Sequence, residues 1–160
     1  MIREAKIEDL PAIVEIYNSS IAGRMATADL EPVTVSSRLD WFDAHNPRRP
    51  IWTIEIDDKI GGWLSLRSFY GRDAYQHTAE VSVYVSTDYH RQHLGDRLLT
   101  HAIASCPNLD LNTLVGFIFG HNQPSINLFK KHKFQQWGFL PQIAKLNGVE
   151  RDLVILGRKI

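Results

Sequence analysis

The sequence has 160 residues, 44% of them apolar and 22% charged, which is enough for one compact domain with an apolar core. Its 18 Lys and Arg residues balance 18 Asp and Glu residues, and this formal net charge of zero argues against a nucleic-acid or polyanion binder. A single cysteine, Cys106, excludes an internal disulfide, and no segment is typical of a signal peptide or a membrane span. We therefore expect a soluble, cytoplasmic protein without a membrane or nucleic-acid partner.

Four segments have apolar residues at helical spacing. They cover residues 8–21, 34–45, 95–105 and 124–132. In the first, Asp9 is the expected N-cap and Pro11 suits the first turn. In the second, Val35, Leu39 and Phe42 are expected to form the buried stripe.

The remaining regular segments have the composition or alternation of strands. They cover residues 2–6, 51–56, 62–69, 78–86, 113–119, 134–139 and 152–158, with a hairpin turn at "DDKIG". Segment 78–86 alternates cleanly, with Ala79, Val81, Val83 and Val85 on one face and Thr78, Glu80, Ser82 and Tyr84 on the other. The order predicts an α/β (α+β) fold, a single domain over residues 1–160 with a mixed, mostly antiparallel sheet flanked by helices.

The segment "YVSTDYHRQHLGDRLLTHAI" passes from a strand through a polar loop into a helix. Such a junction presents free backbone N–H groups and the positive end of a helix dipole, which together favour an anion. The loop matches neither a Walker P-loop nor the dinucleotide GxGxxG pattern. The residues alone therefore favour an anion site only slightly over a structural helix start.

The chain resembles the GNAT superfamily of acetyl-CoA-dependent N-acetyltransferases, and within it phosphinothricin acetyltransferases and related amino-acid N-acyltransferases. The resemblance rests on matches along nearly the whole chain. They are "EIYN", "TADLEPV", "WF", "RDAYQHTAEVSVYVS", the loop at 90–95 with its following "LL", and "NQPSINLF". A single GNAT-like domain that uses acetyl-CoA as co-substrate, and no metal, is the expectation that follows.

The resemblance implies a cofactor site on the strand, the loop and the following helix. Backbone groups of Val83, Tyr84 and Val85 would hold the pantetheine arm, and Asn122 and Ser125 would contact the cofactor from the next strand–helix turn. The pyrophosphate would lie against the loop formed by His90, Arg91, Gln92, His93, Leu94, Gly95 and Asp96.

The resemblance also makes Glu80 the candidate general base, because an amine must lose a proton in order to attack a thioester. The acceptor would be a small amino acid or analogue. Its expected pocket combines Tyr17 and Asn18 with the loop residues Phe69, Tyr70, Arg72 and Tyr75, and Arg72 could bind a carboxylate through two hydrogen bonds.

Three positions, His90, His93 and Phe129, depart from the superfamily pattern. His90 and His93 stand where the loop usually has Gln or Arg and Gly, although histidine is among the residues that tolerate positive φ. Asp96 would repel a diphosphate if it pointed inward. Phe129 stands where many relatives carry a tyrosine general acid, and it cannot donate a proton. His90 and His93 also form an HxxH pair, but a metal site would need further ligands.

Two alternatives stay open at this level. The acceptor could be a polyamine, an antibiotic or a protein N-terminus, which would favour an acidic pocket. The domain could also be a degenerate acyl-CoA-binding sensor. Relatives often form homodimers, so a homodimer is a further expectation.

Overall fold

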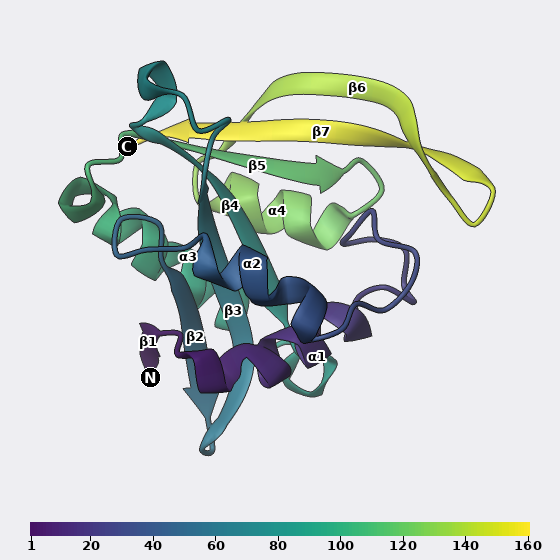
Figure 1. Ribbon diagram of the computed structural model, residues 1–160. Helices are drawn as coiled ribbons and strands as arrows, with labels where there is room; N and C mark the ends of the chain where they lie inside the picture. Colours follow the sequence, from purple (N-terminus) through teal and green to yellow (C-terminus); the bar gives the residue numbers. More distant parts are fainter.

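The computed structural model describes residues 1–160 and contains one seven-stranded sheet with four α-helices (Figure 1). The strands are β1 (Ile2–Glu4), β2 (Ile51–Ile56), β3 (Lys59–Ser68), β4 (Thr78–Val85), β5 (Thr113–Phe119), β6 (Gln135–Leu146) and β7 (Val149–Lys159). The α-helices are α1 (Leu10–Ser19), α2 (Leu39–Asp43), α3 (Leu94–Ser105) and α4 (Gln123–Lys131), with five short 3-10 turns between elements. The predicted element order is confirmed.

The strand order is β1-β2-β3-β4-β5-β7-β6, and every neighbouring pair is antiparallel except β4 with β5. Two hairpins have two-residue turns with positive φ at both positions, as the right-handed twist of paired strands favours. They lie at Asp57–Asp58 between β2 and β3, and at Asn147–Gly148 between β6 and β7. The predicted mixed, mostly antiparallel sheet is therefore confirmed.

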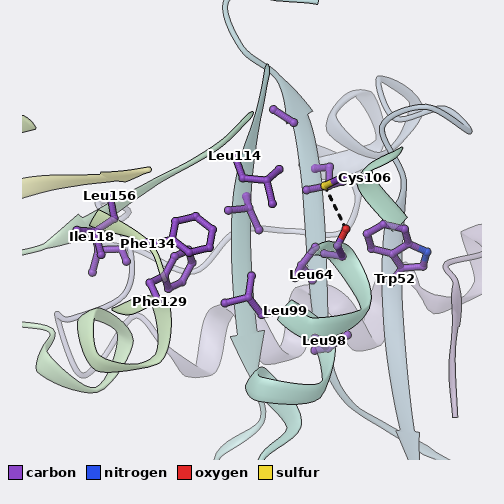
Figure 2. Close-up of a cluster of buried hydrophobic side chains, with 14 of the residues drawn as sticks. Trp52, Leu64, Leu98, Leu99, Cys106, Leu114, Ile118, Phe129, Phe134 and Leu156 are labelled. Atoms are coloured by element: carbon purple, nitrogen blue, oxygen red, sulfur yellow. Dashed lines mark hydrogen bonds between the residues drawn. The ribbon is translucent and has the colours of Figure 1, made fainter. Parts of the chain in front are cut away.

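Helices cover both faces of the sheet. In Figure 1, α1 and α2 lie in front of β2–β4, whereas α3 and α4 lie behind the sheet. The larger apolar core fills the space between the sheet and α3 and α4, and Figure 2 shows part of it. The burial of α3 follows its sequence, since Leu94, Leu98, Leu99 and Ala102 fall on one side of the helix and are all buried.

The second core lies on the opposite face, where α1 packs on the sheet. Ile13, Ile16, Ile51 and Trp63 belong to it, and Trp63 Nε1 donates a hydrogen bond of 3.1 Å to the Ile13 carbonyl in α1. This bond ties α1 to the middle of β3. The candidate site lies on the same face of β3 and β4, next to α1.

Two local predictions about the N-terminal half were wrong. Val35 and Leu39 are exposed at 37% and 42%, because α2 is a single short turn after a 3-10 segment. Phe42 packs against the second core as predicted, and Trp41 does so as well. The Asp9 side chain does not cap α1; it accepts hydrogen bonds from Arg3 and from the Lys6 N–H.

The predicted last two strands were too short. β6 and β7 form a long hairpin that projects from the sheet, and β6 is the edge strand (Figure 1). β6 is exposed on both faces over most of its length, with apolar side chains at Trp137, Phe139, Leu140 and Ile143. No helix of the protein is both long and apolar enough to cross a membrane.

Cys106 is fully buried at the end of α3, where its Sγ donates to the Ala102 carbonyl at 3.2 Å (Figure 2). Burial raises the pKa of the thiol to about 11. The side chain is a small residue of the main core.

Candidate active site

The parallel strands β4 and β5 separate part-way along their length. They pair only at Thr78 with Thr113, Ala79 with Leu114 and Glu80 with Val115. Beyond Glu80, β5 turns away from β4 (Figure 1), so residues 81–85 of β4 have no strand partner on that side. Backbone N–H and C=O groups on this open edge can hydrogen-bond an extended ligand as a neighbouring strand would. Val83, Tyr84 and Val85 all lie on it.

A cavity of about 610 Å³ opens on the front face of the sheet beside this split. The polar face of β4 lines it, as the alternation predicted, with Glu80, Ser82 and Tyr84. The remaining walls come from α1, α2, β3, β5, the β6–β7 hairpin and the loop between α1 and α2. These residues are Ile13, Val14, Tyr17, Ala26, Thr27, Ala28, Asp29, Val33, Arg38, Trp41, Trp63, Ser65, Arg67, Phe117, Phe119, Ile143, Ala144 and Leu153.

Glu80 is partly buried in this cavity, and no side chain or backbone group forms a hydrogen bond with its carboxylate. Burial raises its pKa above the usual glutamate value of 4.5, and the positive charge of Arg67 partly opposes this shift. A carboxylate with a raised pKa is a stronger base than a solvated one, so the environment suits proton abstraction.

The loop between α1 and α2 forms one wall of the cavity and is held by a polar network. The Tyr17 hydroxyl bonds to the Thr27 Oγ1 at 2.5 Å and to the Asp29 carboxylate. Arg38 forms an ion pair with Asp29 at 2.8 Å, and its guanidinium lies 4.8 Å from the Tyr17 ring centroid. Burial and the hydrogen bond to Asp29 raise the pKa of Tyr17, so its hydroxyl stays protonated at neutral pH.

The same loop is also bonded to both sides of the β4–β5 split. The Tyr84 hydroxyl on β4 donates to the Ala26 carbonyl at 3.2 Å, and Asn122 Nδ2 after β5 donates to the Met25 carbonyl at 3.2 Å. His121 Nε2 lies 2.8 Å from the Arg24 carbonyl. The loop therefore spans the two separating strands on the front face.

The N-terminus of α3 has the backbone shape expected of an anion site. His93 adopts the left-handed conformation with φ of 59°, and Arg91 has φ of 68°. The first-turn N–H groups have no acceptor inside the helix until Arg97 N–H, which donates to the His93 carbonyl at 3.0 Å. Histidine therefore takes the turn that glycine usually provides, as the sequence analysis expected.

The charge of Asp96 is paired with two residues at the end of α4, Lys131 and the C-cap residue His132. Its carboxylate bonds to Lys131 Nζ at 3.0 Å and to His132 Nε2 at 2.8 Å. These bonds lower the pKa of Asp96 and join the start of α3 to the end of α4. The negative charge is thus paired with protein groups.

The structure places the other expected cofactor residues around the same region. His90, Arg91 and Gln92 are exposed, Leu94 is buried, and Gly95 faces Leu128, Val83 and Val85. Asn122 caps α4 by accepting from the Ser125 N–H at 3.3 Å, so both ends of its amide are engaged within the protein.

Of the expected acceptor residues, Tyr17 lines the cavity and five do not. Asn18 instead bonds both backbone polar groups of Val33. Phe69, Tyr70 and Tyr75 pack against one another beyond the end of β3, and Arg72 is exposed without a side-chain hydrogen bond or ion pair. The lining of the cavity therefore does not support these five as its walls.

Four further residues line the cavity that were not predicted from the sequence: Arg67, Arg38, Asp29 and Thr27. For Arg67 a signal existed, because its position in β3 alternates with the buried Leu64 and Leu66 and so faces the same side as Glu80. Thr27 and Asp29 belong to the segment "TADLEPV", which was noted only for the resemblance, and Arg38 lies in the 3-10 turn before α2, where no local pattern indicated a site.

Phe129 is 3% exposed and belongs to the main core. Its ring centroid lies 4.9 Å from that of Phe134, and the two rings are neighbours in Figure 2. The ring also fills the space beside Gly116, where a Cβ would lie 2.8 Å from Phe129 Cε2. The residue packs the β5–α4 interface and does not line the cavity.

Residues 11–134 match the model of the acetyltransferase (GNAT) family. The chain belongs to this family. It is accordingly an acetyl-CoA-dependent N-acetyltransferase with a GNAT fold. The match spans α1 to Phe134 and therefore includes the β4–β5 split, the α3 N-terminus and the Asn122 cap.

Individual relatives cover nearly the whole chain. YwnH of Bacillus subtilis, whose name provisionally designates it a phosphinothricin acetyltransferase, is 47% identical over 99% of this chain and 98% of its own. An L-methionine sulfoximine/L-methionine sulfone acetyltransferase of Pseudomonas paraeruginosa is 31% identical over 97% of this chain and 91% of its own. The structure of YncA from Salmonella typhimurium with its cofactor acetyl-CoA superposes with a TM-score of 0.92 at 28% identity, covering 99% of this chain and 92% of that one.

The residues at the split suit the acetyl-CoA that this family uses. The open edge of β4 offers backbone groups to an extended arm, and the α3 N-terminus offers N–H groups to an anion. The paired Asp96 does not oppose a phosphate from the first turn of the helix.

Proposed function

We propose that this protein transfers the acetyl group of acetyl-CoA to the amine of a small amino acid or amino-acid analogue, with Glu80 as general base. The observation that carries the proposal is the position of Glu80, whose unpaired carboxylate lies in the cavity where β4 and β5 separate. The cavity volume of about 610 Å³ fits a small acceptor.

Acetyl-CoA supplies an activated acetyl thioester. Open-edge backbone groups of Val83, Tyr84 and Val85, the loop from His90 to Asp96, and the turn at Asn122 and Ser125 are proposed to hold it. Backbone N–H groups of β4 would polarise the thioester carbonyl.

Glu80 acts on the acceptor. Its carboxylate takes a proton from the amine, directly or through water, as the carbon–nitrogen bond forms and the carbon–sulfur bond breaks. The leaving group departs as a thiolate and takes a proton from water, because Phe129 has none to give. A thiol with a pKa near about 8.5 is an adequate leaving group at neutral pH.

An amino-acid acceptor is favoured over a polyamine by the charges of the cavity. A polycationic acceptor would need an excess of free carboxylates, but Asp29 is already paired with Arg38. The Pseudomonas relative is named for acetylation of an amino-acid analogue, which agrees with this choice.

A thiol-release assay with acetyl-CoA over a panel of acceptors tests the proposal. The panel contains L-amino acids, L-methionine sulfone, phosphinothricin, spermidine, an aminoglycoside and a short peptide with a free N-terminus. We expect turnover on one or more of the amino acids or analogues. Turnover on spermidine, the aminoglycoside or the peptide alone would contradict the proposed acceptor class.

Homodimer formation stays a prediction, which light scattering at several protein concentrations can test.

A further inference from the structure

Arg67 lies directly opposite Glu80 in the antiparallel pairing of β3 with β4. Side chains opposite each other in such a pair project from the same face of the sheet, with Cβ atoms about 4.5–5.5 Å apart. Both residues line the cavity. The guanidinium of Arg67 and the carboxylate of Glu80 are therefore neighbours in the lining of the cavity.

Only four charged residues line the cavity, and two of them neutralise each other. Arg38 forms its ion pair with Asp29 at 2.8 Å. The charges left for a ligand are those of Arg67 and Glu80.

Arg67 and Glu80 do not form an ion pair with each other, and the Arg67 side chain has no hydrogen-bond partner in the protein. Other arginines around the sheet are bonded, as Arg3 is to Asp9 and Glu55, and Arg49 is to the Gln76 carbonyl. The five guanidinium N–H donors of Arg67 are thus free to bind a ligand.

We propose that Arg67 binds the α-carboxylate of the acceptor and so makes the enzyme selective for α-amino acids. This inference rests on the proposed function, because it assigns the second end of a ligand whose amine faces Glu80. In an α-amino acid the amine and the carboxylate are attached to the same carbon, so they must contact protein groups that are close neighbours. Arg67 and Glu80 are such neighbours, with charges opposite to those of the zwitterion.

The guanidinium group suits this role better than an ammonium would. Its planar fork can form two parallel hydrogen bonds to one carboxylate, which fixes the orientation of the acceptor as well as its position. Carboxylate binding by Arg67 would therefore direct the amine toward Glu80. Arg72, the residue expected from the sequence, is outside the cavity lining and cannot form this pair with Glu80 on the same floor.

The test compares L-methionine sulfone with its carboxamide, which keeps the α-amine and lacks the carboxylate. Thiol release is measured for the wild type, Arg67→Ala, Arg67→Lys, Arg72→Ala and Arg48→Ala, the last being a surface arginine paired with Asp110. We expect Arg67→Ala to raise KM for the sulfone about tenfold or more and to change kcat/KM for the carboxamide less than about threefold. Arg67→Lys should recover part of the loss, and Arg48→Ala should match the wild type.

Equal losses on both acceptors in Arg67→Ala would overturn the carboxylate anchor while leaving the proposed transferase in place. A selective loss in Arg72→Ala instead would overturn it in favour of the loop beyond β3. If the wild type turned over neither acceptor, the same comparison is made with the amino acid of the panel that it turns over best and the carboxamide of that amino acid. No turnover on any amino acid or analogue of the panel would contradict both the anchor and the proposed function.

Discussion

Glu80 lies opposite Val115 at the last position where β4 and β5 pair. One step further, the strands separate and β4 has a free edge. The carboxylate is therefore fixed at the point where the closed sheet becomes an open cleft, and the same strand supplies both the proposed base and the proposed cofactor edge. In the proposed reaction, this arrangement would place an acceptor held by Arg67 and Glu80 next to the thioester of a cofactor that lies along the open edge of β4.

Substitutions of His93, which has left-handed backbone geometry, test whether acetyl-CoA binding at the α3 N-terminus depends on the shape of the backbone. His93→Gly should leave acetyl-CoA affinity within about twofold, because histidine already adopts φ of 59°. His93→Val should weaken binding about tenfold, because a β-branched residue is strongly disfavoured in this conformation at a cost of ~1–2 kcal/mol. Calorimetry with acetyl-CoA measures both. Much tighter binding by the glycine variant would show that histidine strains the turn.

Asp96 should contribute to stability through its bonds to Lys131 and His132. We expect Asp96→Asn to lower the free energy of unfolding by about 0.5–1 kcal/mol at neutral pH, with the exposed Asp88→Asn as control. Because the folded pKa of Asp96 is lowered, its stabilisation is present above the unfolded pKa of about 3.9 and disappears as the pH falls through the folded pKa. Urea unfolding at a series of pH values measures this; a pH-independent difference would refute the ionic contribution.

The Tyr17 hydroxyl should hold the α1–α2 loop against the cavity. Tyr17→Phe removes the bonds to Thr27 and Asp29 while it keeps the ring over which Arg38 lies. We expect KM for the acceptor to rise about three- to tenfold, as one charge-assisted hydrogen bond is worth ~1 kcal/mol or more, with little change in acetyl-CoA affinity. Steady-state kinetics with a matched Tyr89→Phe variant, outside the cavity, checks this. Equal kinetics in Tyr17→Phe and wild type would exclude the role.

The sequence predicted the sheet strands β2 and β5 to the residue, and it predicted which face of β4 each side chain occupies. β2 and β5 are buried along most of their length, so each appears in the sequence as a short apolar run, whereas β4 has one buried face and therefore alternates. The β6–β7 hairpin was underestimated for the opposite reason. β6 is exposed on both faces and lacks alternation, although the Asn147–Gly148 pair was an available turn signal.

For the candidate site too, some residues could be located from the sequence and others could not. Glu80 could be placed because it belongs to an alternating strand, and the α3 loop could be placed from the strand–loop–helix sequence. The acceptor walls could not, because Asp29 and Arg38 reach the cavity through a long loop whose course depends on distant partners such as Tyr84 and Asn122. Arg72 was chosen because it lies in the loop before Glu80 and Arg67 was not considered, whereas the register of β3 with β4 favours Arg67.

The pH dependence of acceptor turnover should follow Glu80. At saturating acetyl-CoA, kcat/KM for the acceptor should rise with pH as the carboxylate loses its proton, with an apparent pKa above the usual 4.5. Arg67 lowers this pKa, so Arg67→Gln should move the acidic limb to higher pH. A limb that stayed in place or moved to lower pH in Arg67→Gln would contradict the interaction between the two residues.

The central claim, that Glu80 is the general base, is tested most directly by kcat of Glu80→Gln across the pH range. The variant keeps the size and shape of the side chain, so acetyl-CoA affinity, measured by calorimetry, should stay within about twofold. We predict that kcat at neutral pH falls by about 10²-fold or more, because the amide cannot accept the proton. A kcat equal to that of the wild type at every pH would contradict the claim.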